Sequence, residues 1–181
     1  MTLHSIVTNL LKEQQAPFQS RSRFISTQRL LASHPSQLHE RSLLPGHITA
    51  SLLILSHDSK HVLTIVHSQT QRRLCPGGHL DQDEDPYLSA LREAQEETGI
   101  DPSQLQPLPT WSPSSSAIDL DVHTIPANPK KQEAEHEHHD VMYAVRAPKD
   151  VILQTVNDEG ASQHGHPEIN APSTCWKNMA S

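Results

Sequence analysis

The sequence predicts an α+β domain in which a mixed β-sheet carries one central helix. The first observation is the apolar, β-branched run from His47 to Leu55, which has the composition of a buried strand. The second is the alternation of apolar and polar residues from Ile118 to Ile125, at the period of a half-buried strand. Between these runs, residues 86–98 have the start and stop signals of a helix. Strands on both sides of a helix favour the α+β class.

Two helices are expected before the first strand, in an N-terminal helical appendage of residues 1–40 that precedes a domain of residues 41–156. Ser5 to Gln15 and Arg21 to Ser33 both place apolar side chains at helical spacing. We expect these helices to cover one flank of the core. A homodimer contact and a substrate-specificity element are the alternatives.

The strands that precede the central helix follow from local patterns. His61 to Val66 is expected to pair with the first strand across a turn at residues 57–60. Leu74 to Leu80 predicts a short strand broken by glycines, which let the backbone approach a neighbouring group closely.

After the central helix, the sequence predicts short strands separated by polar segments. Residues 101–116 are rich in proline and serine and predict a loop around a strand at Leu108 to Trp111. Residues 127–135 predict a second loop. The strand expected next is His138 to Ala147, and Val151 to Val156 is a candidate for the last one.

Composition restricts the class of protein. With 181 residues, 34% of them hydrophobic, the chain is long enough for a single domain with a modest core. A net charge of −7 without a basic patch argues against nucleic-acid binding. Cys75 and Cys175 have no metal or disulfide spacing, and no signal peptide or membrane-length apolar run is present. We therefore expect a cytoplasmic protein without a membrane partner.

The central helix carries three carboxylates on one face. Asp85 is a suitable N-cap and Gly99 a suitable C-terminal stop. Glu93, Glu96 and Glu97 then lie at i, i+3 and i+4 and share one side of the helix. Because converging carboxylates repel each other, they need a cation, and hard oxygen ligands suit Mg²⁺ or Mn²⁺.

The segment from Gly78 to Ile100 resembles the Nudix signature, a glycine-loop-helix-loop box of 23 residues. The matching fixed positions are Gly78, Glu84, Arg92, Glu93, Glu96, Glu97 and Gly99. The aliphatic position after the Arg-Glu pair is filled by the smaller Ala94. An exposed, salt-bridged acidic helix is the alternative, but it does not require this spacing. Residues 46–51 and 76–79 resemble one bacterial Nudix subgroup.

The resemblance implies a Nudix-type sheet and a hydrolase that cleaves a diphosphate linkage in a nucleoside diphosphate joined to another group. Mg²⁺, with Mn²⁺ as a substitute, would be bound by Glu93, Glu96 and Glu97. The expected general base is Glu93 or Glu97 acting through water, or an outside group. The expected catalytic residues are Glu93, Glu96, Glu97, Arg92, Glu133 and His136. The expected contacts to a small nucleotide-type substrate are Gly77, Gly78, His79 and His138.

The densest group of the fourteen histidines lies at residues 133–140. On an extended chain His136, His138 and Asp140 point to one side. The same Nudix subgroup begins a strand with an acidic residue and a His-x-His-x-Asp run, which Glu133 and these residues fit. We interpret the segment as a second polar wall of the active site. The alternatives are a solvated loop end and a histidine-rich metal site, for which the spacing of tetrahedral Zn²⁺ ligands is not established by sequence.

The C-terminal residues 157–181 depart from the family pattern. Nudix domains usually end with a strand and a second helix, but glycines and prolines here break any helical pattern. An irregular tail without the closing helix is therefore expected.

Two other classes of protein share parts of this pattern. One is a catalytically idle Nudix module that binds a nucleotide as a sensor, and the other is a histidine-rich metal-binding protein. Retention of every carboxylate of the box argues against the first. The second would bind Zn²⁺ or Ni²⁺ tightly without a substrate, and Glu93 would be irrelevant to it.

Overall fold

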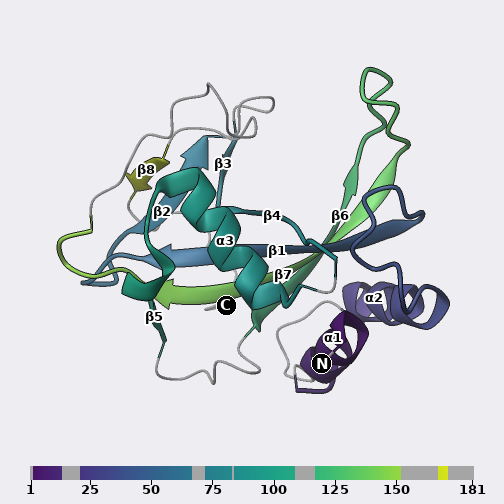
Figure 1. Cartoon of the computed structure of the whole chain (residues 1–181), viewed down its shortest axis with the longest axis horizontal. Helices are drawn as coiled ribbons and strands as arrows, with labels where there is room; N and C mark the ends of the chain where they lie inside the picture. The colour runs from purple at the N-terminus through teal and green to yellow at the C-terminus, as the bar shows by residue number, and fades with distance from the viewer. Residues whose placement is uncertain are drawn as a thin grey trace.

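One mixed sheet with helices packed on it forms the body of the protein (Figure 1). The computed structural model describes residues 2–13, 21–66, 72–82, 84–108, 117–151 and 167–170. The helices are α1 (Leu3–Glu13), α2 (Arg21–Ser33), α3 (Pro86–Thr98) and the 3-10 helix η1 (Pro102–Gln104). The strands are β1 (Gly46–Leu55), β2 (Val62–Val66), β3 (Arg73–Leu74), β4 (Gly77–His79), β5 (Gln106–Pro107), β6 (Ala117–Ile125), β7 (His136–Arg146) and β8 (Pro167–Asn170).

Strand order confirms the predicted α+β class with a mixed sheet. The central path runs β3-β2-β1-β7-β5, with β4 paired to β1, β6 to β7 and β8 to β2. Only β1 and β7 pair in parallel among these strands, from Gly46 beside Glu137 to Leu55 beside Arg146. This long parallel pair fixes which residues of two distant segments share a face of the sheet.

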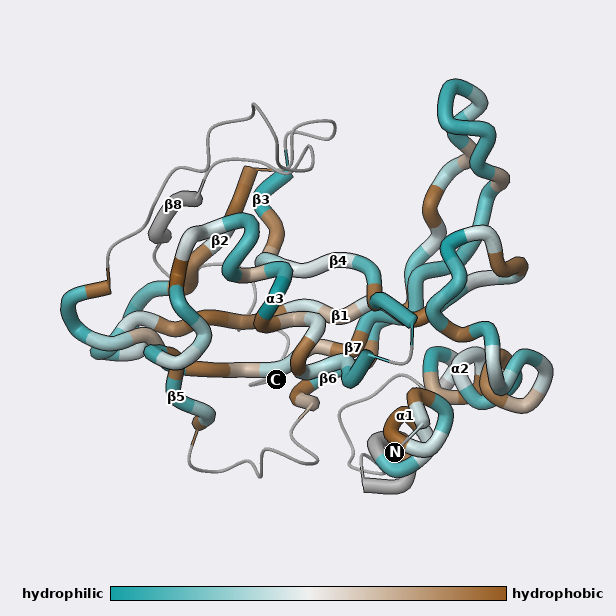
Figure 2. The backbone as a smooth tube through the Cα atoms, in the orientation of Figure 1, coloured by the Kyte–Doolittle hydropathy of each residue, from teal (hydrophilic) through white to brown (hydrophobic). Residues whose placement is uncertain are grey.

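The two faces of β1 have different chemistry. Ile48, Ala50, Leu52 and Ile54 are buried in the main core cluster, whereas His47, Thr49 and Ser51 lie on the opposite face near the start of the strand. Figure 2 shows the apolar residues running along the middle of the sheet and polar residues at the far end of the β6–β7 hairpin. The sheet therefore has one apolar face for packing and one partly polar face.

Helix α3 has the bounds predicted from its caps. The Asp85 side chain accepts a hydrogen bond of 2.8 Å from the Tyr87 amide, and Gly99 ends the helix with a φ of 72°. Ala90 and Ala94 are fully buried in the main core cluster. The small side chain at Ala94 thus lets the helix lie close to the sheet.

The two N-terminal helices contribute to the same core. Leu3, Val7 and Leu11 of α1 and Leu30 and Leu31 of α2 belong to the main core cluster. The Thr27 hydroxyl lies 2.8 Å from Nδ1 of His139, which ties α2 to β7. Figure 1 shows both helices together at the end of the sheet from which the β6–β7 hairpin extends. None of the helices in the described residues is both long and apolar enough to cross a bilayer.

Several elements differ from the sequence-based expectation. The strand after α3 is found at Gln106–Pro107, and most of the segment predicted for it, residues 109–111, lies outside the described residues. Residues 152–156, the candidate last strand, also lie outside them. In the expected loop 127–135, Asn128 and Glu133 form an isolated bridge. Within the expected irregular tail, Pro167–Asn170 forms β8 against β2, a pairing between distant segments that has no local pattern.

Prediction one concerns Gly77, because β4 approaches β1 closely at that residue. A Cβ on Gly77 would lie 2.5 Å from the Ala50 carbonyl oxygen and 2.7 Å from the Ser51 Cα, and neither backbone atom can move freely. We expect Gly77→Ala to lower the free energy of unfolding by about 1–3 kcal/mol, measured by chemical denaturation.

The matched control is Gly78→Ala, where the added Cβ would meet only the flexible end of the Glu93 side chain, at 2.6 Å. This variant should lose less stability than Gly77→Ala. Equal stability of Gly77→Ala and the parent protein would contradict the close approach of the two strands.

Candidate active site

The carboxylates of α3 lie directly against the backbone of β4. Oε2 of Glu97 accepts a hydrogen bond of 3.0 Å from the Gly77 amide. The Glu93 carboxylate occupies the space where a Cβ of Gly78 would be, since its atoms lie 2.6–2.8 Å from that position. The lack of a side chain at Gly78 therefore allows the Glu93 carboxylate to reach the strand, whereas Glu97 reaches it through the Gly77 amide.

Burial separates the three carboxylates that share the helix face. Glu93 and Glu97 are 7% and 5% exposed, whereas Glu96 is exposed. Burial raises the pKa of Glu97 to about 8, although its hydrogen bond from Gly77 acts in the opposite direction. Burial also raises the pKa of Glu93, and the Arg92 guanidinium only partly offsets this effect.

Arg92 is hydrogen-bonded to three carboxylates of the box. Its Nε and Nη2 donate to the two oxygens of Glu84 at 3.1 and 3.0 Å, a two-pronged pair. Its Nη1 donates to Glu93 at 3.0 Å and to Glu96 at 3.2 Å. Its Nη2 also donates to the His79 carbonyl at 3.0 Å, which connects the helix to β4.

The hydrogen bonds of Arg92 stabilise the ionised form of Glu84 more than those of Glu93 and Glu97. Burial acts to raise the pKa of Glu84, but the Arg92 hydrogen bond and charge outweigh it and hold the pKa below its usual value. Glu97 is not among the hydrogen-bond partners of Arg92 and keeps a raised pKa. The buried face is thus short of positive charge, and a set of carboxylate oxygens in this condition fits a hard divalent cation such as Mg²⁺.

Five imidazoles gather at the far side of β4 and along the polar face of the sheet. His47 of β1 and His138 of β7 are direct neighbours in the parallel register, and His123 of β6 lies on the other side of His138. The His79 ring lies 5.1 Å from the rings of both His47 and His138, measured between centroids. His136 joins them from β7, whereas His139 points to the opposite face, toward α2.

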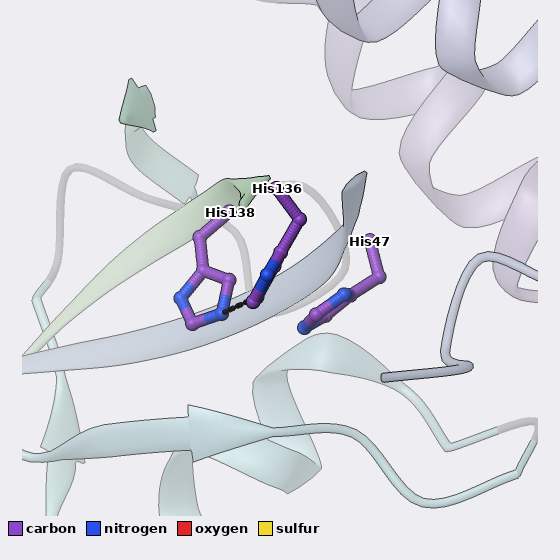
Figure 3. Close-up of side chains that lie close together, drawn as sticks. All are labelled: His47, His136 and His138. Carbon is purple, nitrogen blue, oxygen red and sulfur yellow. Dashed lines mark hydrogen bonds between the residues drawn. The ribbon is translucent and has the colours of Figure 1, made fainter. Parts of the chain in front are cut away.

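Three of these side chains converge most closely. One nitrogen from each of His47, His136 and His138 lies within 4.8 Å of the other two. Figure 3 shows the three rings turned toward one another, two from β7 and one from β1. Sequence analysis expected His136 and His138 in the site but missed His47, whose only local signal is a histidine at the start of an apolar strand.

Burial keeps the rings of His47 and His138 neutral. Burial lowers the pKa of His47 to about 4 and, with neighbouring imidazoles adding to it, the pKa of His138 to about 2. Both ring nitrogens of His47 are buried without a hydrogen-bond partner among the described residues. A buried polar atom without a partner costs about 1–3 kcal/mol, so this ring needs an explanation.

The other predicted residues of the second wall lie in two places. Asp140 is buried on the same face as His138, and it accepts hydrogen bonds from Thr49 at 2.9 Å and Ser51 at 2.7 Å. Glu133 is exposed in the connection between β6 and β7. Figure 1 shows this connection projecting away from α3, so the structure does not bring Glu133 to the carboxylates of the helix.

A positive charge that the sequence analysis missed lies near both groups. Arg41 is an exposed residue before β1. Its positive charge acts to lower the pKa of Glu93 and of His47, and in both cases the effect is smaller than that of burial. Arg41 lies outside the box, in a segment without a motif, so no sequence signal pointed to it.

Comparison with known proteins identifies the family. The model of the NUDIX domain matches residues 45–167. The chain is 28% identical over 125 residues to a protein of Lactococcus lactis subsp. cremoris named "Probable DHNTP pyrophosphohydrolase", a match that covers 69% of each protein. A shorter match, 44% identical over 48 residues, is to a CMP-5'-(N-acetyl-N-hydroxy-3-aminopropyl)phosphonate hydrolase of Streptomyces rubellomurinus. It covers 26% of this chain and 23% of that protein.

A solved structure shows the same fold. The dihydroneopterin triphosphate pyrophosphohydrolase of E. coli matches with a TM-score of 0.50 and 14% identity, over 68% of this chain and 80% of that one. A NUDIX-family hydrolase from Clostridium perfringens matches with a TM-score of 0.48 and 20% identity, over 71% of this chain and 83% of that one. The chain therefore belongs to the Nudix family, and its complete set of box carboxylates makes it a pyrophosphohydrolase of that family.

Prediction two tests the position of Arg92. Arg92→Lys keeps the positive charge but cannot make the two-pronged contact to Glu84 together with the contacts to Glu93 and the His79 carbonyl. We expect the affinity for Mg²⁺ to fall by about tenfold, with a smaller change in kcat at saturating metal, measured by metal titration of activity. Arg29→Lys, at an exposed position of α2, is the control. Overlapping titration curves for Arg92→Lys and the parent would contradict this role.

Prediction three follows from the pKa of Glu97, which burial raises from 4.5 to about 8. The folded protein binds this proton more tightly than the unfolded chain, so the resulting stability is present below pH 4.5 and is lost as the pH rises through 8. Glu97→Gln removes that loss. In metal-free buffer with a chelator, its Tm should exceed that of the parent by about 4 °C or more at about pH 9.

Near pH 4.5 the two proteins should have closely similar Tm values, because the parent carboxyl is then protonated in the folded state. A constant difference in Tm across the whole pH range would contradict the raised pKa.

Proposed function

We propose that this chain hydrolyses a phosphoanhydride bond in a nucleoside diphosphate linked to another moiety, and that the reaction depends on Mg²⁺. The observation that carries the proposal is the pair of buried carboxylates, Glu93 and Glu97, held against the glycines of β4. When ionised, such a buried pair is costly unless a cation neutralises it, so its presence favours a metal-dependent reaction.

The residues that would hold the cation are Glu93, Glu96 and Glu97. The first and last are buried beside β4, and Glu96 extends the same helix face into solvent. The chemistry that Mg²⁺ supplies in such a site is neutralisation of the diphosphate charge and activation of a water molecule. Mn²⁺ has the same preference for oxygen ligands and is expected to substitute.

The surrounding residues position these carboxylates and the substrate. Arg92 holds Glu93 and Glu96 through Nη1, so it is a positioning residue rather than a reacting one. Gly77 and Gly78 lie beside these carboxylates, and we propose that this part of β4 contacts the substrate. Arg41 supplies a positive charge close enough to act on Glu93, where it can attract an anionic substrate. The proton acceptor is proposed among the helix carboxylates, because Glu133 lies in the projecting hairpin.

Relatives guide the choice of substrates to test. The Lactococcus protein is named for DHNTP and the Streptomyces protein for a CMP-linked phosphonate, so both names contain an organic group joined to phosphorus. We propose that this chain takes a small nucleotide-type substrate of the same general kind.

Prediction four tests the reaction and its metal site together. Purified protein with Mg²⁺ is assayed for phosphate or pyrophosphate release across dinucleotides, nucleotide sugars and triphosphates, including dihydroneopterin triphosphate. For a substrate that is turned over, Glu97→Gln should lower kcat by about 10²-fold or more, because a charge of the metal site is lost while helix propensity is retained.

Gln95→Ala is the control, since Gln95 is an exposed residue of the same helix. Near-parental turnover by Glu97→Gln at saturating Mg²⁺ would contradict the assignment of the metal site. Tight nucleotide binding without turnover of any substrate would support a sensor instead.

A further inference from the structure

The convergence of His47, His136 and His138 is a feature that the proposed hydrolysis does not use. Their closest nitrogens all lie within 4.8 Å of one another, the one group of three potential metal-ligand atoms found this close in the described residues. We propose that these three imidazoles form a second metal site, specific for a borderline divalent ion of the Zn²⁺ class and separate from the carboxylate site of α3.

The spacing of the two β7 histidines fits a shared metal. Nε2 of His136 lies 3.3 Å from Nε2 of His138. Two nitrogens bound to one tetrahedral Zn²⁺ at the usual bond length lie about 3.3 Å apart. The backbone therefore already places two donors at the separation that a metal requires, and His47 approaches them from the neighbouring strand.

The hydrogen bond between Nδ1 and Ala134 leaves Nε2 of His136 unprotonated and directed toward His138. Its Nδ1 lies 2.8 Å from the Ala134 carbonyl oxygen, which can only accept a hydrogen bond. Nδ1 must therefore carry the proton, and in the neutral ring Nε2 is left with a lone pair. Without a metal, this lone pair accepts the 3.3 Å hydrogen bond from Nε2 of His138, and a bound ion would replace that contact. A ligand histidine held by a backbone carbonyl through its other nitrogen is the usual support of a protein metal site.

His47 is the independent observation that points to a ligand. Its side chain is fully buried, and neither ring nitrogen has a hydrogen-bond partner among the described residues. Figure 3 shows the ring directed toward the two β7 histidines. A metal ion between the three rings would give this side chain the partner that the protein does not provide.

An anion fits this cluster less well than a cation. The neutral His136 ring uses its only proton for Ala134, so its Nε2 can accept but cannot donate to a phosphate oxygen. Imidazole nitrogens suit Zn²⁺, Ni²⁺ and Cu²⁺, whereas Mg²⁺ prefers oxygen. Asp140, the nearby carboxylate on the same face, is already bonded to Thr49 and Ser51.

The proposed site is bordered by His79, whose ring lies 5.1 Å from those of His47 and His138. His79 is thus the imidazole placed to face the fourth position of a three-histidine site. In this proposal His136 and His138 serve as metal ligands, in place of the base and substrate-contact roles expected from the sequence. The proposal does not depend on the hydrolytic function.

The test uses the full chain, freed of metal with a chelator and kept in excess Mg²⁺ so that the carboxylates of α3 are not available to a second ion. Zn²⁺ is titrated in competition with a chromophoric chelator, and Co²⁺ is titrated with its visible spectrum as the readout. We expect about one Zn²⁺ per chain and the intense absorption of tetrahedral Co²⁺.

Variants separate this site from other histidines. His136→Asn and His138→Asn should each weaken Zn²⁺ binding by at least about tenfold. His57→Ala, in the exposed turn after β1, and Glu97→Gln should leave it unchanged. Unchanged Zn²⁺ affinity in both His136→Asn and His138→Asn, or its loss in Glu97→Gln, would overturn the proposal.

A measurement on the unmodified protein covers the case in which the variants fail to fold. X-ray absorption of the bound Zn²⁺ should show the multiple scattering of about three imidazoles. An all-oxygen first shell would overturn the proposal. It would also be overturned if inorganic phosphate, and not Zn²⁺, raised the Tm of the parent.

Discussion

The candidate active site depends on the contact between the buried carboxylates of α3 and the glycine backbone of β4. Glu97 bonds to the Gly77 amide, and Glu93 fills the space that any side chain at residue 78 would need. This contact brings negative charge into the interior, where burial raises the pKa of both carboxyl groups. Charge of one sign is costly there, so the ionised carboxylates are stabilised by Arg92, and the raised pKa of Glu97 reflects the charge that Arg92 does not offset.

Local sequence was sufficient to predict this half of the site. The caps Asp85 and Gly99 fixed the bounds of α3, and helical periodicity then placed the three carboxylates on one face. The strands Gly46–Leu55, Ala117–Ile125 and His136–Arg146 were also predicted to within two residues, because their apolar patterns are continuous. The role of Arg92 was predictable only in part, since its contacts to Glu84 and the His79 carbonyl depend on how the loop before α3 folds.

The histidine cluster could not be predicted in the same way. His47 and His138 become neighbours only through the parallel register of β1 and β7, and no local pattern fixes that register. The same register explains why Asp140 bonds to Thr49 across 91 residues of sequence. The place of Glu133 was likewise beyond local sequence, since proximity to His136 along the chain does not reveal that the residue lies exposed in the connection between β6 and β7.

The short strand β4 separates two kinds of donor. Gly77 and Gly78 contact carboxylate oxygens of α3, whereas the ring of His79 lies beside the imidazoles of β1 and β7. Oxygen ligands prefer hard ions and imidazoles prefer borderline ones. In our proposal the two donor sets would therefore discriminate between divalent metal ions of the same charge. Because β4 contacts the carboxylates through Gly77 and Gly78 and the imidazoles through His79, the positions of the two donor sets are coupled through this strand.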